Sequence, residues 1–259
     1  MTCAIETVHL EKQFGAELVI RGVDLQVPRG CLFGFVGPNG AGKTTTLSLL
    51  TGLLLPTRGV VTLLGEPMTA ESPALRRRLG VVPDSFVLWE RLRVDELLIL
   101  HGLVYGLRNP DLGQRVDEII DLLDLDEHRH KLVADYSHGL KKRVAFAAAV
   151  LHEPEILFLD EPFEGLDPLS VRVLAANLEA MTARGGTVFL TSHQLDIVQR
   201  LCPRVAVIAK GAIAWEGSTE TLNAQMAQIT PRAPSPLEQL FLELAGTPRT
   251  KEVLTWLER

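Results

Sequence analysis

The most informative segment of this sequence is Gly37-Pro38-Asn39-Gly40-Ala41-Gly42-Lys43-Thr44-Thr45. It fits the pattern G-x-x-x-x-G-K-[ST], which is typical of loops that bind nucleotide phosphates. The apolar run Cys31–Val36 before it predicts a buried strand, and the run Thr44–Leu55 after it predicts a helix. This order places backbone N–H groups and the positive end of a helix dipole around an anion. The sequence therefore predicts that the chain binds a nucleotide, and the alternative is a glycine-rich turn without a ligand.

Single residues of the loop have expected roles. Glycines are needed at 37, 40 and 42 because a side chain would block the phosphate oxygens and because such loops use positive φ. We expect Lys43 to place its charge on the β- and γ-phosphates and the Thr44 hydroxyl to bind Mg²⁺. The predicted nucleotide-binding residues of the loop are Gly37, Pro38, Asn39, Gly40, Ala41, Gly42, Lys43, Thr44 and Thr45.

Composition excludes several classes of protein. The 259 residues are 46% hydrophobic and carry a formal charge of −6, which argues against a nucleic-acid binder held by electrostatics. No apolar run reaches the length of a membrane span, and the N-terminus lacks the features of a secretory signal. The three cysteines are scattered without a C-x-x-C motif, which suits a reducing compartment. We expect a soluble cytoplasmic protein.

Hydrophobic patterns predict the domain organisation. Residues 1–30 indicate antiparallel strands, including two short ones at 18–20 and 23–27. The later alternation of strands with helices indicates a largely parallel sheet, with a hairpin about Lys210-Gly211 near its end. Helical patterns between about 86 and 150 indicate an inserted subdomain. The predicted fold is α/β: a P-loop NTPase core with a mainly parallel sheet, an N-terminal antiparallel β subdomain and an inserted α-helical subdomain. We expect residues 1–225 to form this domain. Residues 226–259 are expected to form a linker at 231–236 and short helices at 237–245 and 250–259.

Acidic and basic side chains end two predicted strands of the core. The apolar segment Glu155–Glu161 ends in Asp160, which can hold Mg²⁺ through water opposite Thr44, and in Glu161, which can orient an attacking water or take its proton. His193 ends the adjacent strand, where it could donate a hydrogen bond to a γ-phosphate. The alternative for His193 is a structural residue with satisfied hydrogen bonds.

Further segments contain candidate functional residues. Phe14, in the turn between the first strands, could stack on an adenine ring or could fill the core at a strand end. The segment Tyr136–Arg143 begins a helix with Ser137 as its predicted N-cap, and Asp167-Pro168 begins another helix with Asp167 as its predicted N-cap.

Together with the P-loop, the segment Tyr136–Arg143 makes the chain resemble the ATP-binding-cassette (ABC) nucleotide-binding subunits over about residues 4–225. The family's signature, usually written LSGGQ, falls on Tyr136–Leu140, and the other family motifs occur in order. The corresponding positions are Phe14 for the adenine-stacking aromatic, Gly37–Thr45 for Walker A, Asp84 for the Q-loop, Asp160 with Glu161 for Walker B and the catalytic glutamate, Phe163–Asp167 for the D-loop, and His193 for the switch histidine.

The resemblance implies a Mg²⁺-dependent ATPase that powers transport. Two cassettes, identical or different, would face head to tail, so that Ser137, His138 and Gly139 contact the ATP of the partner subunit. Asp84 would join Thr44 and Asp160 near Mg²⁺. Closure on ATP would drive integral membrane permease subunits on separate chains, with this chain peripheral on the inner face of the cell membrane and no nucleic acid involved.

Several positions depart from the family pattern. His138 and Leu140 replace the first signature glycine and the glutamine, Asp84 replaces the Q-loop glutamine, and Glu164 replaces a small polar residue of the D-loop. The Ser-His-Gly wording followed by basic residues, and the tail Leu237–Leu244, resemble the branch that serves ABC-2-type exporters.

The sequence disfavours functions other than that of an exporter ATPase. A P-loop GTPase or small-molecule kinase is disfavoured because no N-K-x-D motif is present. A soluble ABC protein acting on nucleic acid is disfavoured, because such proteins usually carry two cassettes, a coiled-coil insertion or a basic surface, and this sequence shows none of them. A nucleotide-dependent switch that binds ATP without hydrolysing it is disfavoured, because the sequence retains Glu161, the carboxylate expected to activate water.

Overall fold

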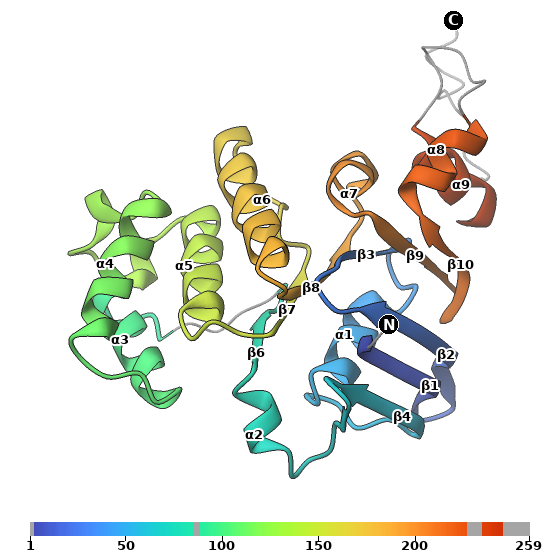
Figure 1. Ribbon diagram of the computed structural model, residues 1–259, viewed down its shortest axis with the longest axis horizontal. Coiled ribbons are helices and arrows are strands. Elements are labelled where there is room, and N and C mark those ends of the chain that lie inside the picture. The colour runs from blue at the N-terminus through green and yellow to red at the C-terminus, as the bar shows by residue number, and fades with distance from the viewer. Residues whose placement is uncertain (1–2, 85–88, 227–234, 246–259) are drawn as a thin grey trace, which may run out of the picture.

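The computed structural model describes residues 3–84, 89–226 and 235–245. Two β-sheets and the first helix form one half of the molecule, and a lobe of helices α3, α4 and α5 lies at the opposite end (Figure 1). The predicted α/β class, with an antiparallel N-terminal sheet and a helical insertion, is confirmed.

The smaller sheet is antiparallel and has the strand order β2-β1-β4-β5. Its strands are β1 Cys3–Phe14, β2 Glu17–Pro28, β4 Arg58–Leu63 and β5 Glu66–Pro67. The sequence predicted two strands within residues 18–27, but they form the single strand β2. Gly22 has a positive φ of 69°, and the register shifts between Leu10 and Glu11, so the chain makes a bulge there and pairing continues.

The larger sheet is mainly parallel and has the order β10-β9-β3-β8-β7-β6. Its strands are β3 Leu32–Val36, β6 Leu79–Val82, β7 Ile156–Asp160, β8 Thr187–Ser192, β9 Arg204–Ala209 and β10 Ala212–Ser218. β10 runs antiparallel to β9 in the predicted hairpin about Lys210-Gly211. Because β3, β7 and β8 are parallel neighbours, their carboxyl ends meet at one edge.

Nine helices connect these strands in the described part of the chain. They are α1 Lys43–Leu50, α2 Pro73–Arg76, α3 Val94–Val104, α4 Asp111–Leu122, α5 His138–Val150, α6 Pro168–Ala183, α7 Leu195–Leu201, α8 Thr219–Met226 and α9 Pro236–Ala245. Two short 3₁₀ turns, Asp126–His128 and Val133–Asp135, precede α5. α1 ends before the predicted Leu55, because the chain turns at Gly52 with φ of 70°.

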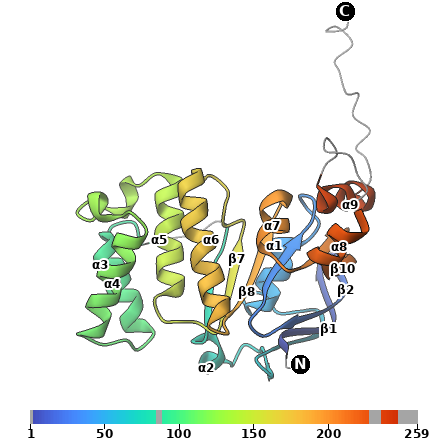
Figure 2. The same cartoon turned by 45° about the horizontal axis from the view of Figure 1, so that its top comes forward.

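Side chains on the larger sheet alternate between two hydrophobic layers. Phe33, Phe35, Phe158 and Phe189 pack on the side of α1 and the smaller sheet, and α1 contacts both sheets. Intervening leucines and valines pack on the other side, against α5, α6 and α7 (Figure 2). The strands are therefore buried on both faces, as expected for a parallel sheet between layers.

The C-terminal described residues return to the core. α8 was not predicted, and α9 corresponds to the predicted helix at 237–245. Leu237 of α9 is buried, and its N–H donates to Gln199 Oε1 of α7 at 2.9 Å. The predicted linker at 231–236 lies largely, and the predicted helix at 250–259 wholly, outside the described residues. Within the described ranges, no helix has the length and hydropathy required to cross a bilayer.

Candidate nucleotide-binding and hydrolysis site

The glycine-rich loop joins β3 to α1, as predicted. Gly40 and Gly42 have φ of 78° and 109°, a region that side chains rarely adopt. Gly37 differs, because its φ is ordinary but a Cβ would lie 2.5 Å from the carbonyl oxygen of Ile208. Two of the glycines are therefore needed for backbone conformation, and Gly37 is needed for close packing against β9.

Lys43 is the first residue of α1 and is almost buried. Its Nζ donates to the carbonyl oxygen of Gly37 at 2.9 Å and lies 3.6 Å from Oε1 of Glu161. The Lys43 and Glu161 side chains are 8% and 11% exposed. The cation at the loop and the carboxylate at the end of β7 thus share one partly dehydrated space, where their charges interact more strongly than in water.

Asp160, the last residue of β7, is positioned by β8. The register pairs Asp160 with Thr191, whose hydroxyl donates to Asp160 Oδ1. Burial raises the pKa of the Asp160 carboxyl, and the hydroxyls of Thr191 and Thr44 act in the opposite direction. Oδ2 is buried without a hydrogen bond of normal geometry among the described residues. A buried carboxylate oxygen beside a threonine hydroxyl fits a divalent cation.

Glu161 and His193 end neighbouring strands and contact each other. Glu161 Oε2 lies 3.0 Å from His193 Nδ1 and accepts the main-chain N–H of His193 at 3.1 Å. The His193 ring is 47% exposed, so it faces solvent beyond the carboxylate. The predicted catalytic pair is therefore brought together at the loop, with Glu161 between Lys43 and His193.

Asp84 follows β6 at the same edge of the sheet. It is exposed, and its negative charge adds to the effect of burial in raising the pKa of Asp160. Trp89, five residues further along the chain, is 53% exposed, and Phe86 between them lies outside the described residues.

Comparisons with known proteins match this arrangement. A family model described as "ABC transporter" matches residues 20–164. The chain belongs to the ABC transporter family. The Nod factor export ATP-binding protein I of Cupriavidus pinatubonensis is 38% identical over 222 residues, which cover 86% of this chain and 68% of that protein.

Two further relatives extend the match. A probable multidrug ABC transporter ATP-binding protein of Escherichia coli (strain K12) is 35% identical over 93% of this chain and 41% of that protein. A solved structure of an ATP-binding subunit of an ABC transporter has a TM-score of 0.85 and 30% identity, and the match covers 95% of this chain and all of that one. This chain is thus an ATP-binding subunit of the ABC type, and membership of the family implies ATPase activity.

The segment that resembles the ABC signature, Tyr136–Leu140, lies apart from the P-loop within one chain. Ser137 caps α5 as predicted, because its Oγ accepts the N–H of Leu140 at 3.3 Å. α5 belongs to the helical lobe, whereas α1 lies between the two sheets (Figures 1 and 2). Within this chain Gly139 packs on the D-loop, since a Cβ there would lie 3.3 Å from the carbonyl oxygen of Gly165.

The aromatic residue of the predicted ATP site is Phe14. Its side chain is 47% exposed, and Lys12 Nζ lies 5.1 Å from the ring centroid. The ring therefore does not fill the core, which was the alternative interpretation from sequence.

The sequence did not predict two polar residues, Thr191 and Lys142, that hold Asp160 and Glu161 in position. Thr191 donates to Asp160, and Lys142 of α5 donates from Nζ to the carbonyl oxygens of Glu161 at 2.5 Å and Glu164 at 3.0 Å. Lys142 lies just before the apolar run Val144–Leu151, which predicts a buried helix. This is a weak signal that Lys142 is buried and has hydrogen-bond partners, because a buried ammonium group without partners is costly. The identity of those partners depends on the tertiary structure.

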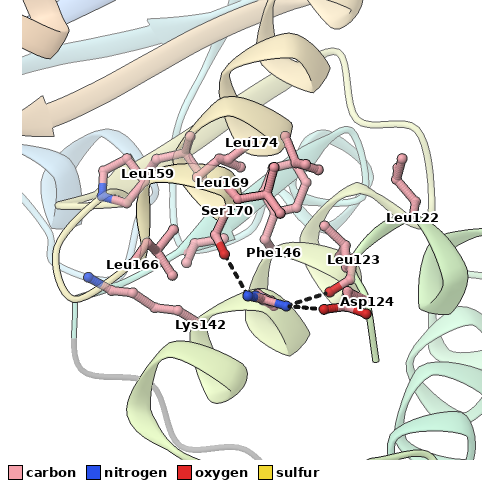
Figure 3. A pocket seen from close by; sticks show the side chains of 14 residues that line it. Leu122, Leu123, Asp124, Lys142, Phe146, Leu159, Leu166, Leu169, Ser170 and Leu174 are labelled. Carbon is pink, nitrogen blue, oxygen red and sulfur yellow. Dashed lines mark hydrogen bonds and ion pairs between the residues drawn. The ribbon is translucent and has the colours of Figure 1, made fainter. Parts of the chain in front are cut away.

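A mostly apolar cavity of about 260 Å³ lies between the end of α4, α5 and α6 (Figure 3). Arg143 crosses it, donating to the carbonyl oxygen of Leu123 at 3.1 Å, to Asp167 Oδ2 at 3.1 Å and to Ser170 Oγ at 2.5 Å. Asp167 also caps α6 as predicted, with Oδ1 accepting the N–H groups of Leu169 and Ser170. No residue of the P-loop is among those that line this cavity, so it is distinct from the P-loop site.

Proposed function

We propose that this chain is the Mg²⁺-dependent ATP-hydrolysing subunit of an exporter. The observation that carries the proposal is the position of the Glu161 carboxylate, 3.6 Å from Lys43 Nζ and 3.0 Å from His193 Nδ1. The loop amides and Lys43 bind the β- and γ-phosphates. Glu161 orients an attacking water or accepts its proton, and His193 donates to the γ-phosphate.

Thr44 and Asp160 would hold Mg²⁺, with Asp84 nearby. The fit rests on the buried Oδ2 of Asp160, which has no hydrogen bond of normal geometry among the described residues. When bound, the ion would supply positive charge that stabilises the negative charge of the phosphate groups. Thr191 keeps the Asp160 carboxylate oriented through Oδ1, which leaves Oδ2 for the cation or its water.

The proposed working unit contains two cassettes. Ser137, His138 and Gly139 of one chain contact the ATP on the P-loop of the partner subunit, and Phe14 stacks on the adenine. This arrangement is supported by the exposed positions of Ser137 and His138 at the start of α5, since a helix N-terminus favours a phosphate.

Membrane subunits on separate chains complete the transporter in this proposal, so this chain is held peripherally on the inner face of the membrane. Export is favoured because the named relatives are an export ATP-binding protein and a probable multidrug transporter subunit.

Phosphate release from the purified chain tests the hydrolytic part. We expect Mg-ATP to support turnover and EDTA to abolish it. We expect Glu161→Gln to bind ATP but to release phosphate very slowly. A chain that binds ATP and releases none, with or without its membrane subunits, would be a nucleotide-dependent switch.

A further inference from the structure

We propose that Lys142 is a positioning residue for Glu161, which couples the signature helix of a chain to hydrolysis in that same chain. The inference rests on the proposed function, because it assigns Glu161 to hydrolysis and Ser137 to the ATP of the partner subunit. Lys142 itself touches no nucleotide in this proposal. It acts by holding the main chain of Glu161 and of the D-loop, which is Phe163–Asp167.

The ammonium group of Lys142 is buried and bonded to main-chain oxygens. The residue is 3% exposed, and Nζ donates to the carbonyl oxygens of Glu161 at 2.5 Å and Glu164 at 3.0 Å. Within the described residues, no carboxylate oxygen lies within 4.0 Å of Nζ. Figure 3 shows the ammonium end of Lys142 pointing away from the apolar side chains of the cavity. Burying such a cation is costly, so a methionine of similar length would pack at lower cost if packing were its role.

The main chain that Lys142 holds has an unusual conformation. Glu161 has a φ of 48°, in the left-handed region that side chains other than glycine rarely adopt. Its N–H donates to the carbonyl oxygen of Thr191 at 3.1 Å, and its carbonyl oxygen accepts from Lys142. Both main-chain polar groups of Glu161 are therefore hydrogen-bonded, and surrounding contacts of this kind allow a strained conformation to persist at a functional site.

This conformation decides where the carboxylate lies. The left-handed turn directs the Glu161 side chain between Lys43 and His193, whereas Asp160 before it faces Thr191. Without the bond to Lys142, the carbonyl oxygen of Glu161 would lose a partner that fixes this peptide unit. We expect the carboxylate then to occupy the productive position less often, with Lys43 and the loop amides unchanged.

The same lysine joins Glu161 to the signature. Lys142 lies little more than one helical turn after Ser137, on a helix that packs on the D-loop through Gly139 and Gly165. The next residue, Arg143, donates to Asp167 Oδ2 and Ser170 Oγ. The start of α5 and the D-loop are thus held together by several contacts. When Ser137 moves on binding the ATP of the partner subunit, the main chain of Glu161 therefore moves with it.

Steady-state ATPase assays of Lys142→Met, with Lys141→Met as the matched control, test the proposal. Lys141 is the preceding residue of α5, and its Nζ forms an ion pair with Glu90 at 2.5 Å, away from Glu161. We expect Lys142→Met to lower kcat about tenfold or more while ATP affinity stays within about twofold, because the phosphate-binding groups are untouched. The melting temperature should stay the same or rise. Lys141→Met should keep kcat within about twofold of wild type.

A second readout addresses coupling between the two ATP sites. If wild-type turnover depends cooperatively on ATP concentration, Lys142→Met should bring the Hill coefficient towards one. Lys142→Arg, which restores a cationic donor, should recover much of the lost kcat. Lys142→Leu keeps the test available if the methionine variant does not fold, because leucine also lacks a hydrogen-bond donor for the two carbonyl oxygens.

The outcomes separate this inference from the proposed function. A wild-type chain that hydrolyses ATP, together with an inactive Glu161→Gln variant, supports the proposed function whatever Lys142 does. Against that background, a folded Lys142→Met or Lys142→Leu variant with kcat within about twofold of wild type would overturn the inference. A loss of melting temperature in parallel with kcat, not recovered by Lys142→Arg, would show that Lys142 is structural.

Discussion

Oε2 of Glu161 lies 3.0 Å from Nδ1 of His193 and accepts the main-chain N–H of the same histidine at 3.1 Å. These residues are far apart in sequence and meet because β7 and β8 are parallel neighbours that end at the same edge of the sheet. The same edge carries the P-loop after β3. Sequence-distant polar groups are thereby gathered where a nucleotide phosphate can reach all of them.

We predict that Glu161→Gln retains ATP affinity within a few-fold and lowers turnover by about a hundredfold or more. The amide cannot accept a proton, but it keeps the size of the side chain and leaves Lys43 and the loop amides in place. Lys43→Ala should instead weaken ATP binding itself. Equilibrium binding and phosphate-release assays on both variants check this, and turnover of Glu161→Gln within about twofold of wild type would contradict the assignment.

An ATP-dependent dimer is the second prediction. Glu161→Gln should dimerise in Mg-ATP at tens of micromolar, because each ATP offers negative charge to Ser137 and the N-terminus of α5 of the partner, at about 1–3 kcal/mol for each such hydrogen bond. Ser137→Arg in the same background should remain monomeric. Light scattering with and without Mg-ATP measures both. Equal dimerisation of the two variants would mean that Ser137 is no more than the cap that its bond to Leu140 provides.

Asp84→Ala is predicted to lower the ATPase activity that depends on the membrane subunits more than it lowers ATP binding. Asp84 is exposed at the end of β6, and Trp89 beyond it is 53% exposed, so this side of the site can face a membrane subunit. The measurement compares ATPase activity of the chain alone and of the assembled transporter. Unchanged activity of the assembled transporter would remove Asp84 from the coupling mechanism.

Acid stability should depend on His101. Burial, together with the charge on nearby His152, lowers the pKa of His101 to about 4, and the Tyr105 ring stacks on both imidazoles. The unfolded chain binds a proton near pH 6.5 and the folded chain does not, so the free energy of unfolding falls as the pH drops from 6.5 towards 4.

His101→Phe tests this pH dependence. The variant should lose about 2 kcal/mol less of its unfolding free energy than wild type between pH 7 and pH 5. Urea denaturation at both pH values measures the difference. A pH dependence of stability equal to that of wild type would show that His101 titrates in the folded state as it does in the unfolded chain.

Close packing of α5 on β6 gives a prediction about stability. A Cβ at Gly80 would lie 2.3 Å from the carbonyl oxygen of Ala149, so Gly80→Ala should destabilise the fold by about 1–3 kcal/mol. Gly113→Ala is the matched control in α4, where a Cβ would meet Asn109 Oδ1 at 3.7 Å. The control should be neutral or up to about 1 kcal/mol more stable, because alanine favours the helix. Thermal denaturation of both variants compares them.

The sequence by itself determined the P-loop, most of the order of strands and helices, the caps at Ser137 and Asp167, and the hairpin at Lys210-Gly211. These features depend on local chemistry: glycine conformations, side-chain caps and hydrophobic periodicity within a few residues. Local signals were less reliable at boundaries. Gly22 became a bulge inside β2, and Gly52 ended α1 early, because sheet pairing and packing set those limits.

The tertiary structure decided which polar groups meet. Register between β7 and β8 places Thr191 on Asp160 and His193 on Glu161, and the packing of α5 on the D-loop brings Lys142 to the Glu161 carbonyl oxygen. Such partners are separated by tens of residues, and a shift of one residue in a strand would turn each side chain to the opposite face. A lysine beside an apolar helical run therefore predicts only that its ammonium group has hydrogen-bond partners. The packing of α5 against the end of β7 determines that these partners are the carbonyl oxygens of Glu161 and Glu164.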